Sequence, residues 1–286
     1  MNENQKKYKG FVALTFVIVL CSIIIIIVGC GAESTKEPDN NPQVVLEEYY
    51  QCIMDGNYNR AYDNLANINR DSYAKDEFEV LYDTINEIAQ LRSFRVSERE
   101  RFKNEKVGFV TYEEAIKFDV VQTIFIFKED KESTSTTDGW VVKEDGQWRV
   151  YREKDGNIDE EISNILHELA FMYLNGQGKR LDYREAATTF RAALKYNQNN
   201  PFAHFGLGIS LFELTNYEEA LNSFQIALIL FGDLGNDEFR SHSLTWIGSY
   251  YEYKGNMIEA RKSYEEALDI FPDNQWAIDG LKRVVN

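Results

Sequence analysis

Apolar and polar residues follow four different patterns along this chain of 286 residues. Phe11 to Val28 is an uncharged, almost wholly apolar run, whereas Gly31 to Asn41 is small, polar and without periodicity. In residues 42–155, apolar residues first recur at helical spacing and then alternate with polar ones, and in residues 156–286 the helical spacing returns. The pattern predicts an α+β region followed by an all-α region.

The apolar run is long enough to enter a membrane. As a helix, its 18 residues would reach about 27 Å, close to the ~30 Å hydrocarbon core of a bilayer. Lys6, Lys7 and Lys9 precede it, which predicts an N-terminus in the cytoplasm and export of everything after the run. The run is either a cleaved export signal or a retained anchor.

The end of the run, Ile27-Val28-Gly29-Cys30, resembles a bacterial lipobox. The resemblance implies a lipoprotein whose signal peptide, residues 1–29, is removed and whose Cys30 carries diacylglycerol, with residues 30–41 as a lipidated tether. We therefore expect lipid anchoring at the bacterial cell membrane, facing outside the cytoplasm. Cys52 lies in a helical apolar stripe, which predicts a buried side chain rather than a nucleophile.

Residues 42–155 are predicted to hold three helices and then antiparallel strands. The helices are expected over Pro42 to Gly56, Tyr58 to Leu65 and Ala74 to Ala89, and the strands over Phe94–Phe102, Phe109–Val110, Ile116–Phe127 and Trp140–Val150. Asp145-Gly146 in the last segment favours a tight hairpin turn.

This region resembles the nuclear transport factor two-like domains of bacterial lipoproteins. The resemblance rests on the order of elements, on the closing W-x-V…DG-x-W-x-V hairpin, and on an opening segment with Pro42, Val45, Tyr49, Tyr50, Gly56, Asn57, Tyr58, Ala61 and Tyr62. It implies a cone-shaped α+β fold of three helices and a curved antiparallel sheet that enclose a pocket. Seven aromatic residues are candidates to line that pocket or simply to form core: Tyr49, Tyr50, Phe94, Phe109, Phe125, Phe127 and Trp140.

Carboxylates on the predicted strands raise the question of catalysis, because enzymes of this superfamily hold an acidic residue in the pocket. Glu98 and Glu100 are expected on one strand face with Phe94 and Phe102, and Asp119 is a second candidate. The alternative is that these carboxylates are solvated and paired with neighbouring arginines. We favour it, since residues 1–155 contain no histidine, and predict no catalytic residue and no enzyme.

Residues 156–286 contain an internal repeat. The pattern E-A-x3-[FY]-x2-A-L begins three times, with its first alanines at 186, 220 and 260, which lie 34 and then 40 residues apart. We expect the six extra residues of the third copy to form a loop at Gly232 to Asp237. A small residue also recurs before each copy, where two helices approach closely.

These repeats resemble the tetratricopeptide repeat. The signature residues are Ala170, Ala186, Phe190, Ala193, Gly208, Ala220, Phe224, Ala227, Gly248, Ala260, Tyr264, Ala267 and Pro272. The resemblance implies three stacked helix pairs, after which a helix from Trp276 with Lys282 and Arg283 caps the open end.

In this family the first helix of each pair lines a concave partner groove. The corresponding residues here are Asn164, His167, Phe171, Phe202, Phe205, Ile209, Phe212, His242, Thr245, Ser249 and Tyr253. The basic and asparagine residues that hold a terminal carboxylate in some members are absent, so we expect an apolar or helical partner segment. The alternative for Phe205 and Ile209 is packing between repeats.

Charge and composition exclude several function classes. Asp and Glu outnumber Lys and Arg by 47 to 31, for a net charge of −16, which argues against nucleic-acid binding. The three histidines, 167, 204 and 242, fall on different repeats, and no cofactor motif occurs, so we expect neither a metal nor a cofactor. The sequence favours a membrane-anchored interaction module with an unknown protein or peptide partner. The alternative is a small-ligand-binding protein using the middle pocket.

Overall fold

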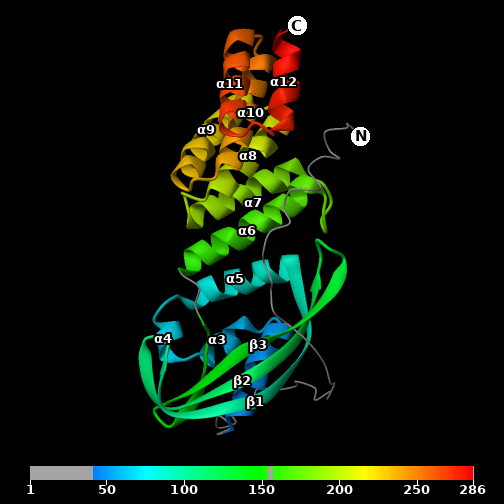
Figure 1. Ribbon diagram of the computed structural model, residues 1–286. Helices are drawn as coiled ribbons and strands as arrows, with labels where there is room; N and C mark the ends of the chain where they lie inside the picture. The colour runs from blue at the N-terminus through cyan, green and yellow to red at the C-terminus, as the bar shows by residue number, and fades with distance from the viewer. Residues whose placement is uncertain (1–40, 154–156, 286) are drawn as a thin grey trace. The chain divides into compact units, whose positions relative to one another are not determined.

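The computed structural model describes residues 41–153 and 157–285, and they form two compact units (Figure 1). The first unit extends to Glu161 and the second begins at Ile162, so the boundary falls inside helix α6 (Ile158–Asn175). The predicted signal peptide and Cys30 lie outside the described residues. Within the described ranges, no helix has both the length and the apolar character needed to cross a membrane.

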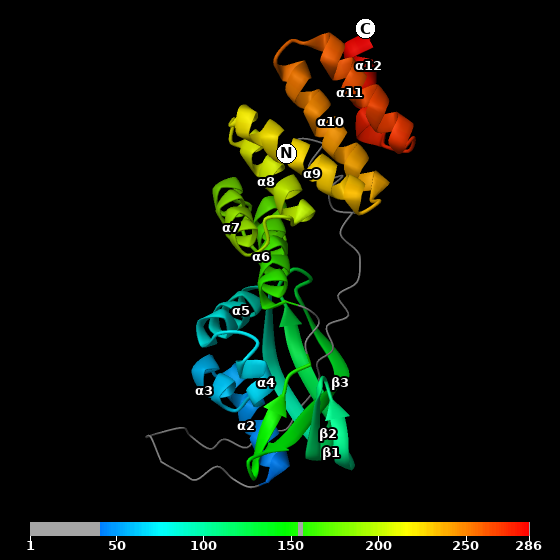
Figure 2. The same cartoon turned by 90° about the vertical axis from the view of Figure 1, so that its left-hand side faces the viewer.

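The first unit begins with helices and continues with a sheet, as predicted, but its described residues before the sheet hold four helices rather than the three expected, because the short α4 was missed. The helices are α2 (Pro42–Met54), α3 (Tyr58–Asp63), α4 (Asn67–Arg70) and α5 (Lys75–Ile88), and Figure 2 shows them on one side of the sheet. Pro42 occupies the first turn of α2, where its missing N–H costs nothing, and the Asn41 side chain accepts a hydrogen bond from the Gln43 amide.

The sheet has four strands in the order β1-β2-β3-β4, all antiparallel. They are β1 (Ala89–Val107), β2 (Val110–Ile126), β3 (Lys131–Glu144) and β4 (Gln147–Tyr151). Asp145 and Gly146 join β3 to β4 with φ values of 49° and 79°, so the predicted turn with two positive φ angles is confirmed. The α+β arrangement predicted for this region is confirmed as well.

Helix α2 packs closely against the sheet at Gly139 on β3. Gly139 pairs with the fully buried Phe118 on β2. A Cβ atom at this glycine would lie 2.5 Å from Val120 Cγ2 and 2.9 Å from Leu46 Cδ2 of the helix. The missing side chain therefore makes room for Leu46, which is 1% exposed.

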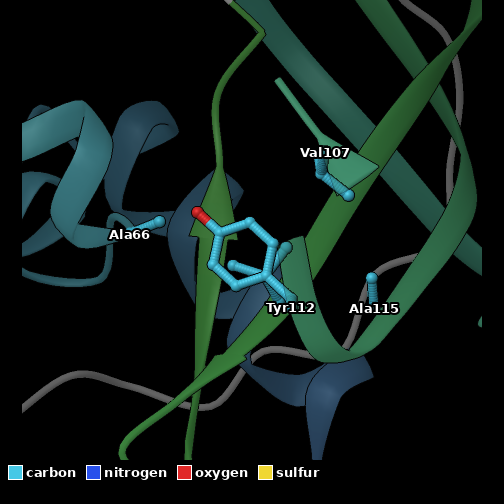
Figure 3. Packing of buried hydrophobic residues seen from close by; sticks show 5 residues of the cluster. Ala66, Val107, Tyr112 and Ala115 are labelled. Atoms are coloured by element: carbon cyan, nitrogen blue, oxygen red, sulfur yellow. The ribbon is translucent and has the colours of Figure 1, made fainter. Parts of the chain in front are cut away.

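A second cluster of buried residues joins the helical segment after α3 to the β1–β2 hairpin. Its members are Ala66, Val107, Tyr112, Ala115 and Val142, and the partly buried Trp140 packs against them. In Figure 3 the Tyr112 ring lies between Ala66 and the strand positions Val107 and Ala115. The cluster connects the hairpin to the helical layer.

The segment between α3 and α4 closes the β4 edge of the sheet with hydrogen bonds. The Ala66 amide donates to the Val150 carbonyl over 2.8 Å, and the Val150 amide donates to the Asn64 carbonyl over 2.9 Å. Asn69, 2% exposed, continues this pairing with its side chain, which donates to the Arg152 carbonyl over 2.7 Å and accepts from its amide over 3.0 Å. These bonds satisfy the backbone N–H and C=O groups of Val150 and Arg152 at this edge.

The second unit is entirely helical (Figure 1). After α6 come α7 (Tyr183–Tyr196), α8 (Pro201–Glu213), α9 (Tyr217–Asp233), α10 (Asp237–Tyr253), α11 (Met257–Ile270) and α12 (Gln275–Val285). From α7 onward each helix packs against the next, and Phe171 of α6 contacts Phe190 of α7 with ring centroids 5.0 Å apart.

Aromatic rings pressed against glycines hold these helices together. A Cβ atom at Gly206 would lie 2.1 Å from Phe190 Cζ, and one at Gly208 would lie 2.6 Å from Phe224 Cε1. Tyr264 fills the same role between α10 and α12, because Cβ atoms at Gly248 and Gly280 would lie 2.6 Å and 2.5 Å from its ring. The signature alanines are fully buried beside these rings: Ala170, Ala186, Ala193, Ala220, Ala227, Ala260 and Ala267. Pro272 is exposed and follows the end of α11.

The six extra residues of the third copy lengthen two helices, so the prediction of a loop at Gly232 to Asp237 is wrong. Helices α9 and α10 have 17 residues each, against 14 in α7 and 13 in α8, and only residues 234–236 connect them. The added turns bring in Phe231 and Phe239, whose rings lie 5.1 Å apart and each 5.1 Å from the Phe202 ring. Burial of these rings stabilises the longer helices.

The ring-to-glycine contact predicts a large effect for Gly206→Ala. The new methyl group would overlap the Phe190 ring, which we expect to lower the free energy of unfolding of the second unit by about 1–3 kcal/mol, measured by urea denaturation. Gly232→Ala is the control, because a Cβ there has no neighbour closer than 3.7 Å, and it should be neutral or stabilising by up to about 1 kcal/mol. Equal effects of the two substitutions would contradict this account.

Candidate functional site

The predicted groove residues lie on α6, α8 and α10, and they divide into two groups by exposure. Those that keep accessible surface are Asn164, His167, Phe202, Phe212, Ser249 and Tyr253. Those that are buried are Phe171, Phe205, Ile209, His242 and Thr245. Only the first group is able to touch a partner without rearrangement, so the accessible face is smaller than the repeat register implies.

Buried asparagines at helix N-termini account for part of this difference. Asn200 caps α8 by accepting from the Ala203 amide, and its Nδ2 reaches back to α6, 3.0 Å from Ser163 Oγ and 3.2 Å from His167 Nδ1. The His167 ring is also stacked on Phe202 at 5.7 Å. His167 thus joins two repeats while one part of it stays accessible.

Asn274 makes the same connection at the other end of the unit. It caps α12 through the Ala277 amide, and its Nδ2 lies 2.8 Å from Ser241 Oγ and 2.9 Å from Thr245 Oγ1 on α10. Thr245 is therefore engaged in packing between helices. A repeat alignment does not reveal this, because the partner is separated by 29 residues in sequence.

The side chains of Phe205 and His242 are buried against aromatic rings. Phe205 is 5% exposed and contacts Phe224, Phe231 and Phe239, which confirms the alternative of packing between repeats for this residue. The His242 ring contacts Trp276 at 4.7 Å, and burial lowers the pKa of His242 to about 4.

An aromatic rim lies along the C-terminal halves of α8 and α10 and the start of α9. We define it as Phe212, Tyr217, Trp246 and Tyr253. The Phe212 ring is 5.0 Å from Tyr217 and 5.2 Å from Trp246, and the Tyr217 and Tyr253 rings are 3.9 Å apart. Tyr253 is 57% exposed, so the rim extends to the surface.

Glu213 is the carboxylate next to this rim. It is the last residue of α8, and the surrounding protein raises its pKa by removing water from it. Desolvation also raises the pKa of Tyr217, with further contributions from Tyr253 and from the charge of Glu213. Glu218, by contrast, has a lowered pKa because Lys254 and Tyr250 hydrogen-bond to it.

The sequence pattern missed Glu213, Tyr217 and Trp246. Glu213 directly follows the predicted groove residue Phe212, and Tyr217 opens a second helix, which the family pattern excludes from the groove. Trp246 occupies the α10 position that corresponds to Gly206 in α8, and its ring stacks on Phe224 at 5.4 Å. The sequence did hold one signal for Trp246, because a tryptophan stands there at the position where the preceding repeat has a glycine.

The structure does not bring the candidate carboxylates of the first unit together. Glu98 pairs with Phe118 on β2 but Glu100 pairs with Lys117, because a bulge at Arg99 inserts one extra residue. The two glutamates therefore face opposite sides of the sheet, and the expectation of a shared face is wrong. Glu98 forms an ion pair of 2.8 Å with Arg101.

Asp119 is likewise at the surface, paired with Arg99 over 3.1 Å, and its side chain is 39% exposed. The solvated alternative is thus confirmed for Glu98 and Asp119. No described cluster of three His, Cys, Asp or Glu side chains has the geometry to hold a metal ion.

The seven aromatic candidates of the first unit do not surround one space. Tyr50 contacts Tyr49 at 5.3 Å and Phe94 at 5.6 Å. Trp140 instead contacts Phe102 and the cluster of Figure 3. Phe109 lies at the β1–β2 turn and is 92% exposed, so it belongs neither to a cavity wall nor to the core, and both expectations are wrong for it. Phe125 and Phe127 contact each other at 5.3 Å.

Several polar groups in the interior of the first unit bond to one another. The Tyr49 and Tyr82 hydroxyls are 2.9 Å apart. Arg152 forms an ion pair with Glu161, and its guanidinium lies 5.9 Å from the centre of the Tyr82 ring. Burial acts to lower the pKa of Arg152, but Tyr82, Glu161 and Tyr49 together raise it. Cys52 is 6% exposed, as predicted for a buried side chain.

The capping helix α12 is held by its basic end. Arg283 Nε and Nη2 each lie 2.8 Å from a carboxylate oxygen of Glu252 on α10, and Tyr264 donates to the same carboxylate over 2.7 Å. The hydrogen bonds from Arg283 lower the pKa of Glu252, while burial is the main cause that raises the pKa of Tyr264 to about 12.

Comparison with known families agrees with the helix geometry. Residues 177–238 and residues 241–274 each match a tetratricopeptide repeat model. The second unit contains tetratricopeptide repeats. A comparison of the sequence with curated proteins finds no match.

Several similar solved structures are described as tetratricopeptide repeat proteins or domains. The first TPR of Spaghetti (RPAP3) bound to HSP90 peptide SRMEEVD is 20% identical, with a TM-score of 0.38, and the match covers 43% of this chain and 90% of that one. YrrB, described as a TPR protein with an unusual peptide-binding site, is 22% identical with a TM-score of 0.36, over 44% and 63% of the two chains. The N-terminal domain of STI-1 from C. elegans is 12% identical with a TM-score of 0.40, over 46% and 100%.

The buried His242 predicts a loss of stability in acid. The ordinary pKa is 6.5 and the folded value is about 4, so the unfolded chain binds an extra proton between these pH values. Protonation therefore lowers the free energy of unfolding as pH falls from 6.5 to 4, by about 2–3 kcal/mol from this residue alone. Below the folded pKa the loss is complete.

The measurement is urea denaturation of wild type and His242→Leu from pH 7 to pH 4. Carboxylates contribute to both proteins, so the difference in slope isolates the histidine. The variant should lose about 2–3 kcal/mol less over this range. Parallel pH profiles would show that His242 is not the acid-sensitive group.

Proposed function

We propose that this chain is an extracytoplasmic bacterial lipoprotein that binds a protein partner through the groove of its tetratricopeptide repeats. The observation that carries the proposal is an accessible face on successive first helices, with Asn164 and His167 on α6, Phe202 and Phe212 on α8, and Tyr253 on α10. Aromatic and polar side chains at the end of a repeat groove are typical of protein-recognition surfaces.

The chemistry of this face favours an apolar partner segment with polar flanks. The accessible positions are aromatic, hydroxylic or amide-bearing, and none is lysine or arginine. A terminal carboxylate would find no cation there. We infer a helical or extended segment whose apolar side chains contact Phe202 and Phe212.

The first unit has a supporting role in this proposal. Its nuclear transport factor two-like resemblance suggests a second binding surface or an element that presents the repeats. The Tyr49 and Tyr82 hydroxyls and Arg152 are already engaged with neighbours, so these groups do not favour the alternative of a small-ligand site, and they favour an enzyme acting in the pocket even less.

The groove is tested by photo-cross-linking the full chain in intact membranes. Phe212→Ser should reduce recovery of the cross-linked partner about tenfold or more, because an aromatic anchor is lost. Ile229→Ser is the matched control, since Ile229 is 64% exposed on α9, outside the groove helices, and its recovery should equal wild type. Melting temperatures of both variants establish that they fold. Unchanged recovery with Phe212→Ser would rule out this groove.

The anchor is tested separately with Cys30→Ser. Lipidation requires the Cys30 thiol, so we expect this variant to lose incorporation of radiolabelled fatty acid and to keep its signal peptide. Cys52→Ser should incorporate label as wild type does. Label that persists in Cys30→Ser would contradict the lipoprotein assignment.

A further inference from the structure

The aromatic rim forms a continuous path of rings from the core to solvent. Phe224 is fully buried and stacks on Trp246, Trp246 contacts Phe212, and the path continues through Tyr217 to Tyr253 at the surface. A ring anchored in this way is held in place before a ligand arrives, and its exposed face carries the negative potential of the π system.

Glu213, the residue that follows Phe212 of the rim, adds a full negative charge at a position where the fold does not compensate it. No lysine or arginine in the described ranges forms an ion pair with it, whereas Glu218 pairs with Lys254 and Glu252 pairs with Arg283. It is also the last residue of α8, where the negative end of the helix dipole disfavours a carboxylate. The charge of Glu213 therefore does not stabilise the second unit.

Two independent features of this surface therefore select the same ligand chemistry. Ring faces and an uncompensated carboxylate both attract a cation, and both repel an acidic group. A guanidinium fits them together, because it is planar, stacks on aromatic faces and donates paired hydrogen bonds to a carboxylate. An ammonium offers a point charge without the stacking surface.

We infer that the aromatic rim and Glu213 receive an arginine side chain of the partner segment. The inference rests on the proposed groove function and specifies its partner. The segment places apolar side chains on Phe202 and Phe212 and an arginine at the α8–α10 end, stacked on Tyr253 and paired with Glu213. The chain's own Lys254 does not occupy this place, because it pairs with Glu218 and lies 5.6 Å from the centre of the Tyr250 ring.

A phage-displayed library of random dodecapeptides, panned on the full chain, tests the inference. We expect the enriched peptides to share an arginine at a fixed distance from apolar residues. Panning on Glu213→Gln should lose that arginine, whereas Glu266→Gln, which removes an equal charge from the exposed surface of α11, should retain it. Enriched peptides without a shared arginine would overturn the inference and leave the groove function standing. No enriched peptide at all would overturn both.

One enriched peptide then gives the energetic test. Replacing its arginine by citrulline removes the charge and keeps the shape, and we expect about a tenfold weaker Kd for the wild-type chain by fluorescence anisotropy. The same replacement should change the Kd by less than about twofold for Glu213→Gln, because the two groups act on each other. Equal losses for both proteins would show that the arginine binds elsewhere and would overturn the inference.

Discussion

The second unit depends on the approach of an aromatic ring to a position that has no side chain. Three such contacts set how closely successive helices pack: Phe190 against Gly206, Phe224 against Gly208 and Tyr264 against Gly248. The fully buried alanines lie beside these rings. The contacts at Gly208 and Gly248 join the two helices of one repeat, whereas those of Phe190 with Gly206 and Tyr264 with Gly280 join neighbouring repeats, so the full set forms only when repeats stack. The groove is a result of this packing, since the same helices present their other faces to solvent.

Buried asparagines complement the rings in both units. Asn69 closes the edge of the sheet, and Asn200 and Asn274 each join a helix N-terminus to an earlier helix. An amide side chain has both a donor and an acceptor, which allows it to satisfy two buried backbone or hydroxyl groups at once. The rings pack closely but impose no directional bonds, whereas the hydrogen bonds of these amides fix the orientation of one helix relative to another.

Periodicity was sufficient to predict the order of elements, the two regions and the repeats, because core faces recur at fixed spacing in helices and strands. It was not sufficient where one residue changes the register. The bulge at Arg99 separates Glu98 from Glu100, and no pattern in the strand announces it. The accessible groove was also narrower than predicted, because Thr245 and Phe205 bond or pack with residues far away in sequence. Glu213 was missed because the sequence does not show which carboxylates lack an ion-pair partner in the fold.

The longer helices α9 and α10 have a geometric consequence for anything bound along the groove. Equivalent positions in the second helices are 34 residues apart between the first and second copies and 40 apart between the second and third. Trp246 occupies the position that Gly206 occupies one repeat earlier. A helix rises about 1.5 Å per residue, so α10, with 17 residues, is about 6 Å longer than α8, with 13. A partner that lies across both helices therefore meets about one more helical turn on α10 than on α8.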